Sequence, residues 1–259
     1  MLIKEFLSRF EEVIPANYQD DWDNSGLQVG DTNVEIKGIF VCLDVTNEVI
    51  EEARLLGANL ILSHHPILFR STKKLDYDFF ISKKIIDAIK NDIVIYSSHT
   101  AIDVNEKGLN QFVFKEMGFR SKGKIEVTEV PHGYGDFTDI PPAKIEHLAE
   151  QIKERLELDH IVFYGDDQRL VSKIGLVTGA GSSFLERVVQ LGIELYITAD
   201  VKHHEAMDAL EQGINVMDLG HYPSEKLFNV LVEKIIKDID SNITIYRETE
   251  LDRYKRYII

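Results

Sequence analysis

The chain has 259 residues, of which 44% are hydrophobic and 28% charged, a composition typical of a globular protein with one or two domains. Its formal net charge of −15 argues against a nucleic-acid partner, because an acidic surface repels phosphates at long range. No apolar stretch is long enough for a membrane helix, which argues against a membrane partner. Acidic residues near the N-terminus exclude a signal peptide, and the only cysteine, Cys42, lies in an apolar run. We therefore expect a cytoplasmic protein without disulfides.

The first half of the sequence alternates between strand and helix patterns. An amphipathic helix over 1–14 comes first, and the polar stretch 17–32 predicts a long loop. After it, the predicted strands are 38–44, 59–63 and 93–97, and the predicted helices are 47–57, 82–91 and 109–118. Strands that alternate with helices of this length favour mostly parallel, doubly wound sheets, and hence the α/β fold class.

The second half continues the alternation after a change of texture. Residues 125–142 hold turn residues and short strand-like pieces, and Pro142 predicts the first turn of a helix over 142–156. Further strands are predicted at 161–165, 173–179, 195–198, 214–220 and 242–248, and further helices at 185–192, 203–213 and 225–239.

The change of texture also predicts a domain boundary near Gly123. We expect a first α/β domain over 1–124 and a second over 125–225. The C-terminal segment 226–259 is expected to pack on the first domain.

The two halves resemble each other in sequence. They align over 38–65 with 173–200 and, after a gap of thirteen residues, over 93–103 with 215–225. This alignment superposes His99 on His221 and Asp103 on Glu225. An internal duplication of one α/β unit explains the match, and so does the periodicity that any two strand–helix–strand units share.

Four histidines directly follow predicted strands. His64 and His65 follow the strand 59–63, His99 follows 93–97 and His221 follows 214–220. Open α/β sheets bind ligands beyond the carboxyl ends of their strands, so these imidazoles lie where a site is expected. A single histidine at a strand end is more often a hydrogen-bonded structural residue than a ligand, and the prediction depends on the combination.

Two of these histidines have a carboxylate four residues further on, at the spacing of one helical face: His99 with Asp103, and His221 with Glu225. Imidazoles and carboxylates without a thiolate suit a divalent ion such as Zn, Mn, Fe or Ni. The set exceeds the three protein ligands of one catalytic metal, so it predicts two ions. Adjacent residues of an extended chain point in opposite directions, so His64 and His65 can serve one ion each. Water held between two such cations has a lowered pKa and becomes a nucleophile near neutral pH.

Four motifs follow one another along the chain: WDNSGLQVG at 22–30, LSHHP at 62–66, HTAID at 99–103 and GHYPSEK at 220–226. On these motifs the sequence resembles the GTP cyclohydrolase I type 2 family, also called Nif-three-like proteins, from its first helix to its last strand. The resemblance implies two interlinked α/β domains, a dinuclear metal site between them and a toroidal homohexamer. It places the family's metal ligands on His64, His65, Asp103, His221 and Glu225, with Glu225 bridging the ions. His99 then lies near the site, where it supports a ligand or faces the substrate.

The predicted function is that of a dinuclear metal-dependent hydrolase that activates water against a nucleotide-like or phosphorylated small molecule. His99 is the predicted catalytic residue and shuttles the proton. Two alternatives stay open: a metal-binding or regulatory scaffold without catalysis, and a genuine GTP cyclohydrolase that releases formate from GTP. No part of the sequence identifies a guanine pocket or the native metal.

Overall fold

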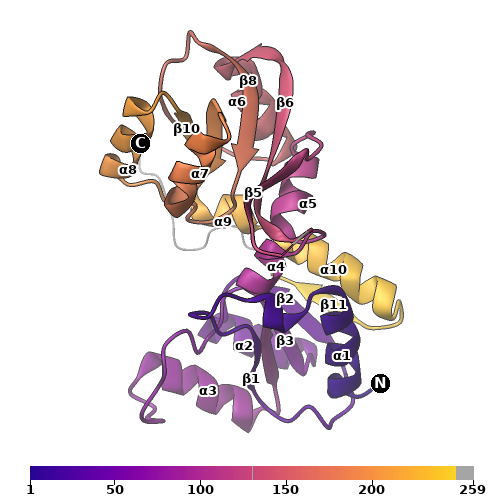
Figure 1. Cartoon of the computed structure of the whole chain (residues 1–259). Helices are drawn as coiled ribbons and strands as arrows, with labels where there is room; N and C mark the ends of the chain where they lie inside the picture. The colour runs from indigo at the N-terminus through magenta and orange to yellow at the C-terminus, as the bar shows by residue number, and fades with distance from the viewer. Residues whose placement is uncertain (130, 249–259) are drawn as a thin grey trace. The chain divides into compact units, whose positions relative to one another are not determined.

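The computed structural model describes residues 1–129 and 131–248 of the chain (Figure 1). Contacts between its elements divide it into two compact units. The first unit holds residues 1–102 and the segment that begins at Phe228, and the second unit holds 103–227. The predicted boundaries after 124 and 225 stay a prediction, and residues 249–259 of the predicted C-terminal segment lie outside the described residues.

The first unit is built on a five-stranded sheet with the order β1-β4-β3-β2-β11. Its strands are β1 (Gly26–Val29), β2 (Ile39–Cys42), β3 (Leu60–Ser63), β4 (Val94–Ser97) and β11 (Ile245–Arg247). All pairs are parallel except that of the edge strand β1, which runs antiparallel to β4. The expected α/β fold with a mostly parallel sheet is therefore confirmed in this unit.

Helices cover both faces of this sheet (Figure 1). They are α1 (Ile3–Val13), α2 (Asn47–Leu56), α3 (Phe80–Lys90) and α10 (Phe228–Ile239), with a 3₁₀ turn, η1, at Ala16–Tyr18. Side chains of alternate strand residues, such as Phe40 and Ile61, pack with α2 and α3 in one apolar core. On the other face Tyr96 packs against Phe10 of α1 at 5.9 Å between ring centroids, and α10 lies against α1 and β2. Each of these buried aromatic or aliphatic side chains contributes about 1.5–3 kcal/mol to folding.

The connection between β2 and β3 has clear start and stop signals. The Thr46 hydroxyl accepts a hydrogen bond from the backbone N–H of Val49 at 3.1 Å and caps α2. Gly57 ends the helix with φ +76°, in the left-handed region that favours glycine. Because both ends of α2 are fixed, β2 and β3 lie side by side in parallel and end at the same edge of the sheet.

The second unit is built on a six-stranded sheet with the order β5-β6-β8-β9-β10-β7. Its strands are β5 (Gly123–Val127), β6 (Gly133–Lys144), β7 (Val162–Tyr164), β8 (Leu170–Leu176), β9 (Leu195–Thr198) and β10 (Asn215–Asp218). Its helices are α5 (Leu109–Glu116), α6 (Ile145–Arg155), α7 (Leu185–Gln190), α8 (His203–Glu211) and α9 (His221–Glu225), with a 3₁₀ turn, η2, at Ser182–Phe184. The short helix α4 (Thr100–Val104) carries the chain from the first unit into the second. Only β8, β9 and β10 are parallel, so this sheet is mixed.

Two sequence expectations differ from the structure. The stretch 17–32 is not all loop, because it contains the edge strand β1. Pro142 does not open a helix, because β6 continues to Lys144 and α6 begins at Ile145. The register of β6 against β8 shifts between Asp139 and Ala143, and such an irregularity accommodates a proline that cannot donate to the ladder.

The parallel strands of the two units correspond in their first pair but not in their second. Leu60 of β3 pairs with Ile39 and Val94, and Leu195 of β9 pairs with Ile174 and Asn215. In both units the leucine and its partner on the preceding strand are 21 positions apart along the chain. The leucine and its partner on the following strand are 34 positions apart in the first unit and 20 in the second. These two separations differ by 14 positions, which is one more than the gap of thirteen residues in the sequence alignment that superposes His99 on His221. The strand–helix–strand cores therefore correspond, but strand register does not place the two histidines at equivalent positions.

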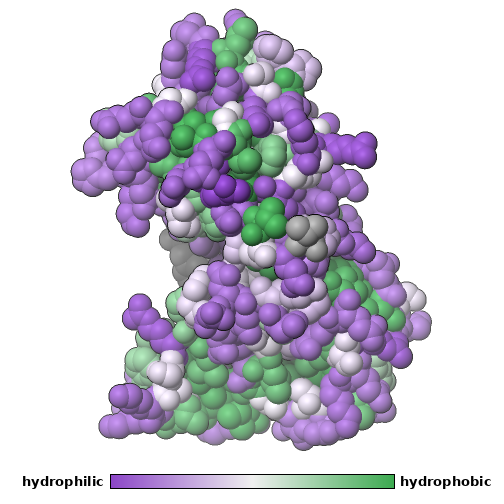
Figure 2. Space-filling view, viewed as in Figure 1, coloured by the Kyte–Doolittle hydropathy of each residue, from purple (hydrophilic) through white to green (hydrophobic). Residues whose placement is uncertain are grey.

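None of the described helices is long and apolar enough to cross a membrane. The face seen in Figure 2 is largely hydrophilic, with apolar patches on both units. This surface agrees with the acidic composition of the chain.

Candidate metal centre

Three neighbouring strands of the first unit end at one edge, and the predicted histidines lie directly beyond them. The pairing of the strands continues past their ends, since the N–H groups of His64 and His65 donate to the carbonyls of Cys42 and Leu43 at 3.2 and 2.9 Å. The backbone that carries the two histidines is therefore held as firmly as the strand before it.

His64 and His65 are oriented by different acceptors. Nδ1 of the fully buried His64 lies 2.9 Å from the Ser98 carbonyl oxygen. Since a carbonyl only accepts, Nδ1 carries the proton and the lone pair of the neutral ring is on Nε2. Nδ1 of His65 lies 3.0 Å from Oδ1 of Asp44, two residues past the end of β2. Both rings thus present Nε2 on the side away from their acceptor.

His99 is oriented by a buried carboxylate. Its Nδ1 lies 2.8 Å from Oδ1 of Asp23, whose side chain is fully buried. The other oxygen of Asp23 accepts hydrogen bonds from the backbone N–H and hydroxyl of Thr100 and from the hydroxyl of Ser25. Burial by itself raises the pKa of the Asp23 carboxyl, but the hydrogen bonds from His99 and Thr100 outweigh it and hold the pKa well below its usual range. Asp23 is therefore an ionised anchor for the imidazole.

The three histidines of the first unit form one cluster. One ring nitrogen of each lies within 4.8 Å of the other two. The ring centroids of His64 and His65 are 4.9 Å apart, and His99 lies 5.2 and 5.5 Å from them. The cluster thus brings together two of the predicted ligands and the predicted catalytic residue.

The second unit repeats the arrangement of aspartate and histidine at neighbouring strand ends. Asp200 follows β9 and His221 follows β10, and Oδ2 of Asp200 lies 2.8 Å from Nδ1 of His221. Asp44 and His65 in the first unit have the same separation of 21 residues along the chain. Asp200 has φ +54°, in the left-handed region that non-glycine residues seldom adopt. Local strain of this kind often accompanies a functional site.

Glu225 meets His221 within the second unit. Its Oε2 lies 3.1 Å from Nε2 of His221, one helical turn away on α9, and the residue is only 4% exposed. Oε1 of Glu225 lies over Gly179, where a Cβ atom would come within 2.3 Å of it. Glycine is therefore required at position 179 for Glu225 to occupy this place.

Asp103 lies at the start of the second unit and is 9% exposed. Its carbonyl accepts a hydrogen bond from the Asn110 amide at 3.0 Å, and the Asn110 oxygen accepts one from the Thr178 N–H at 2.9 Å. The Gly179 N–H donates to the Ser224 hydroxyl at 3.0 Å. Both predicted carboxylate ligands are thus anchored to the residues that follow β8.

The residues present fit divalent ions. Nδ1 of each of the four histidines faces an acceptor, the usual arrangement of metal-binding imidazoles. Two ligands on one ion with bonds of about 2.0–2.1 Å are about 3.0–3.4 Å apart. The 3.1 Å between His221 Nε2 and Glu225 Oε2 matches that separation. Imidazole and carboxylate donors without sulfur suit Zn, Mn, Fe or Ni.

Three carboxylates that orient these histidines were missed from the sequence. Asp23 belongs to the acidic stretch DDWD, which would ordinarily be only a solvated loop. Asp44 and Asp200 could have been found, because each lies two residues past a strand whose parallel neighbour is followed by a predicted histidine.

Comparison with known proteins agrees with the motifs. The model of the family described as Duf34/NIF3 (NGG1p interacting factor 3) matches residues 1–250. The chain belongs to the Duf34/NIF3 family. The resemblance expected from the four motifs is therefore confirmed.

Relatives of this protein share nearly the whole length of the chain. A Clostridium perfringens protein named GTP cyclohydrolase 1 type 2 homolog is 36% identical over 248 residues, which cover 94% of each chain. The structure of a Staphylococcus aureus hypothetical protein has a TM-score of 0.91 at 27% identity and covers 100% of this chain and 99% of its own. A Bacillus cereus protein related to NIF3 has a TM-score of 0.93 at 22% identity with the same coverage, and shows the likeness of the fold alone.

Proposed function

We propose that this Duf34/NIF3 protein is a metal-dependent hydrolase that binds two divalent ions and acts on a nucleotide-like or phosphorylated small molecule. The proposed ligands are His64, His65, Asp103, His221 and Glu225. Two divalent ions would supply a polarised water of lowered pKa and a clamp for the charge that develops in hydrolysis. The main support is that each proposed histidine ligand has Nδ1 against an acceptor, which is the usual arrangement of metal-binding imidazoles.

His99 is the proposed proton carrier. Asp23 accepts from Nδ1 of His99 and fixes the ring, much as an aspartate orients a catalytic histidine elsewhere. Imidazole is the side chain that most often serves as a general acid or base, and Nε2 of His99 is the atom proposed to carry the proton. The side chain of His99 is 17% exposed, so solvent can exchange protons with it.

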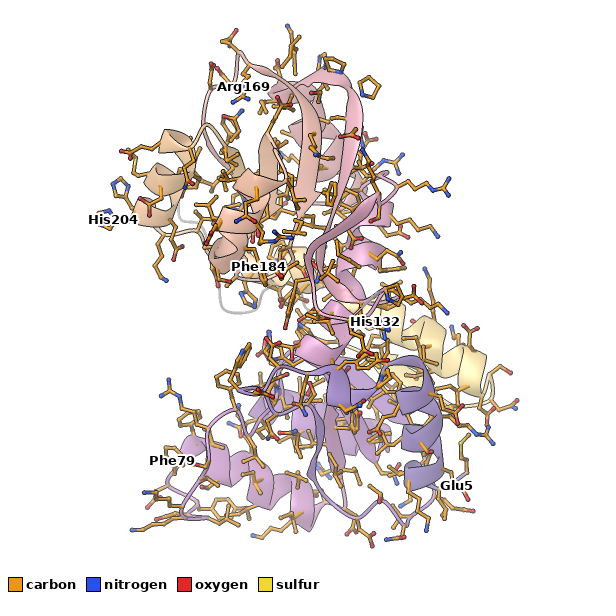
Figure 3. All side chains as sticks on the ribbon, viewed as in Figure 1. Glu5, Phe79, His132, Arg169, Phe184 and His204 are labelled. Carbon is orange, nitrogen blue, oxygen red and sulfur yellow. The ribbon has the colours of Figure 1, made fainter. Side chains whose placement is uncertain are left out.

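Metal content tests the ligand set directly. We expect about two divalent ions per chain by elemental analysis of the purified protein, and their loss in His64→Ala combined with Glu225→Ala. His204→Ala is the matched control, because this exposed imidazole extends outward from the start of α8 (Figure 3). Purified protein without metal, or undiminished metal in the double variant, would refute the proposal.

Turnover tests the catalytic step separately from metal binding. A screen of metal-loaded protein over nucleotides and phosphoesters should find a substrate, and His99→Gln should lower its turnover by about 10²–10⁴-fold at unchanged metal content. Bound metal without turnover of any substrate would favour the non-catalytic scaffold instead.

The name of the Clostridium perfringens relative favours one specific substrate as a second candidate. It is called a GTP cyclohydrolase 1 type 2 homolog, so GTP belongs in the screen, with formate release as the measurement. Equal formate from the wild type and His65→Ala would exclude this activity. We further propose a cytoplasmic homohexamer, as the family resemblance implies, and light scattering during size exclusion should then give six chain masses.

A further inference from the structure

A cavity of about 730 Å³ lies in the first unit, on the segment that directly follows the LSHHP motif. Its lining runs from Ile67 to Ile81 and includes three aromatic rings, Phe69, Phe79 and Phe80, and three cations, Arg70, Lys73 and Lys74. The volume lies within the range of about 300–1,000 Å³ that is usual for small-molecule sites. Figure 3 labels Phe79, on the loop before α3, at the edge of this unit.

The charge of this cavity is opposite to that of the chain. The whole sequence has 44 acidic and 29 basic residues, yet Asp76 is the one acid among the lining residues. Across residues 1–129 and 131–248, no ion pair involves Arg70, Lys73 or Lys74. By contrast, Lys83 outside the cavity lies 2.7 Å from a carboxylate oxygen of α3. Three cations without carboxylate partners create a local positive potential that attracts an anion.

The start of α3 adds to this potential. Phe79 is the N-cap residue and makes no side-chain capping bond, and the first helical turn contains no acidic residue. The N–H groups of that turn carry partial positive charge. Phe79 and Phe80 line the cavity, so this end of the helix borders it.

Exposed rings connect the cavity with the histidine cluster. Phe69 is 50% exposed, and its ring lies 6.2 Å from His99 and 5.9 Å from Trp22. Trp22 is 59% exposed and lies 6.0 Å from His99. Exposed aromatic faces of this kind bind flat rings by stacking.

We propose that this cavity binds an organic phosphate that carries an aromatic or heteroaromatic ring, such as a nucleotide. The phosphate contacts Lys73 and Lys74, and the ring stacks on Phe69. The inference rests on the proposed function and assigns its substrate class, because a ring on Phe69 lies next to His99. The test distinguishes this ligand from two other occupants. One is inorganic phosphate alone, and the other is a second copy of the chain that covers the exposed rings.

Fluorescence of Trp22, the only tryptophan, measures binding of adenosine monophosphate, with adenosine and inorganic phosphate as separate probes. Titrations use the full chain as purified and again after chelator treatment. We expect saturable quenching by adenosine monophosphate in both, and weaker binding of adenosine and of phosphate. Lys73→Ala combined with Lys74→Ala should raise the dissociation constant at least about tenfold, because charge-assisted hydrogen bonds are lost.

The matched control is Lys83→Ala combined with Lys90→Ala, which removes the same charge from α3 outside the cavity. It should leave the affinity unchanged. Phe69→Leu, measured by calorimetry, should weaken adenosine monophosphate about tenfold and leave phosphate unaffected, because a stacked base contributes about 1–3 kcal/mol.

Three results of the binding measurements would overturn the inference. These are equal affinities in the two lysine double variants, no saturable binding at millimolar concentrations, and equal affinities for adenosine monophosphate and inorganic phosphate. A change of oligomeric state in the cavity variants without a change in nucleotide affinity would assign the cavity to contacts between copies and would also overturn it. Because binding is also measured without metal, a failure here leaves the metal content of the purified protein as an independent test of the proposed function.

Discussion

Replacement of Gly179 by alanine tests the placement of Glu225 with a single methyl group. Gly179 has φ +64°, and a Cβ atom there would lie 2.3 Å from Oε1 of Glu225, whereas real Cβ contacts are essentially never under 3.0 Å. The backbone cannot retreat easily, because the Gly179 N–H donates to Ser224 and its carbonyl accepts from Ala199 and Thr198. The Glu225 carboxylate must therefore move by roughly 0.7 Å or more, the difference between 2.3 and 3.0 Å.

Gly192→Ala provides the matched control. Gly192 has φ +66°, and its Cβ would have no neighbour within 4 Å. Both variants thus carry the same backbone strain of about 1 kcal/mol, which lowers the melting temperature by about 2–4 °C. Only Gly179→Ala displaces a proposed metal ligand, so we expect its metal affinity alone to fall by about 10–100-fold.

Competition with a chromophoric chelator measures that affinity, and thermal unfolding measures the strain. Equal metal affinities in the two variants would refute the assignment of Glu225 as a ligand held by contact with Gly179. A much larger loss of stability in Gly179→Ala, beyond the shared strain, would show that the methyl group disturbs the fold and not the carboxylate alone.

Three further predictions concern other parts of the structure. Burial raises the pKa of the fully buried Cys42 thiol, so iodoacetamide should label it only after denaturation, and rapid labelling of the native protein would contradict its burial. Lys124→Met removes the partner of buried Asp136, at 2.9 Å, and should cost about 3–5 kcal/mol of unfolding free energy. Burial raises the pKa of the Asp136 carboxyl, so the folded state binds its proton more tightly than the unfolded state. The unfolding free energy of the variant should therefore rise as the pH falls from about 7 to about 5. An unfolding free energy that does not change with pH in denaturant unfolding would contradict this. Asp44→Asn and Asp200→Asn should each lower metal affinity about 10–100-fold in the chelator assay, because these carboxylates orient His65 and His221. Unchanged affinity in both variants would show that they do not.

Local sequence signals were sufficient for most elements of the fold. The helix α2 shows why, since Thr46 before it and Gly57 after it are signals that depend only on neighbouring residues. The edge strand β1 had no such signal. It has four residues, begins at Gly26 and pairs with β4 about 70 positions away in an irregular register, so its strand state comes from a long-range contact.

The site residues also divide into those with a local sequence signal and those that depend on long-range contacts. His64 and His65 could be predicted because a polar pair directly after a buried strand lies at the ligand-binding edge of a parallel sheet. The role of Asp23 could not, because its burial depends on hydrogen bonds to His99 and Thr100, 76 and 77 positions further along the chain. Acidic loop residues are ordinarily solvated, and only the folded loop distinguishes this one from Asp21, which is exposed.

The interrupted order of the first unit has a consequence for synthesis of the chain. Strand β2 acquires its neighbour β11, and the sheet acquires its cover α10, only after the 125 residues from 103 to 227 have been made. At about 5–20 residues per second, that delay is roughly 6–25 seconds. Throughout it the nascent first half has an open strand edge and an uncovered apolar face, the features that invite aggregation. Phe228, which packs against the buried ring of His64 at 5.0 Å between centroids, is the first residue of the returning segment. The contact between Phe228 and His64 therefore forms only after this delay, although the three clustered histidines precede the second unit in the chain.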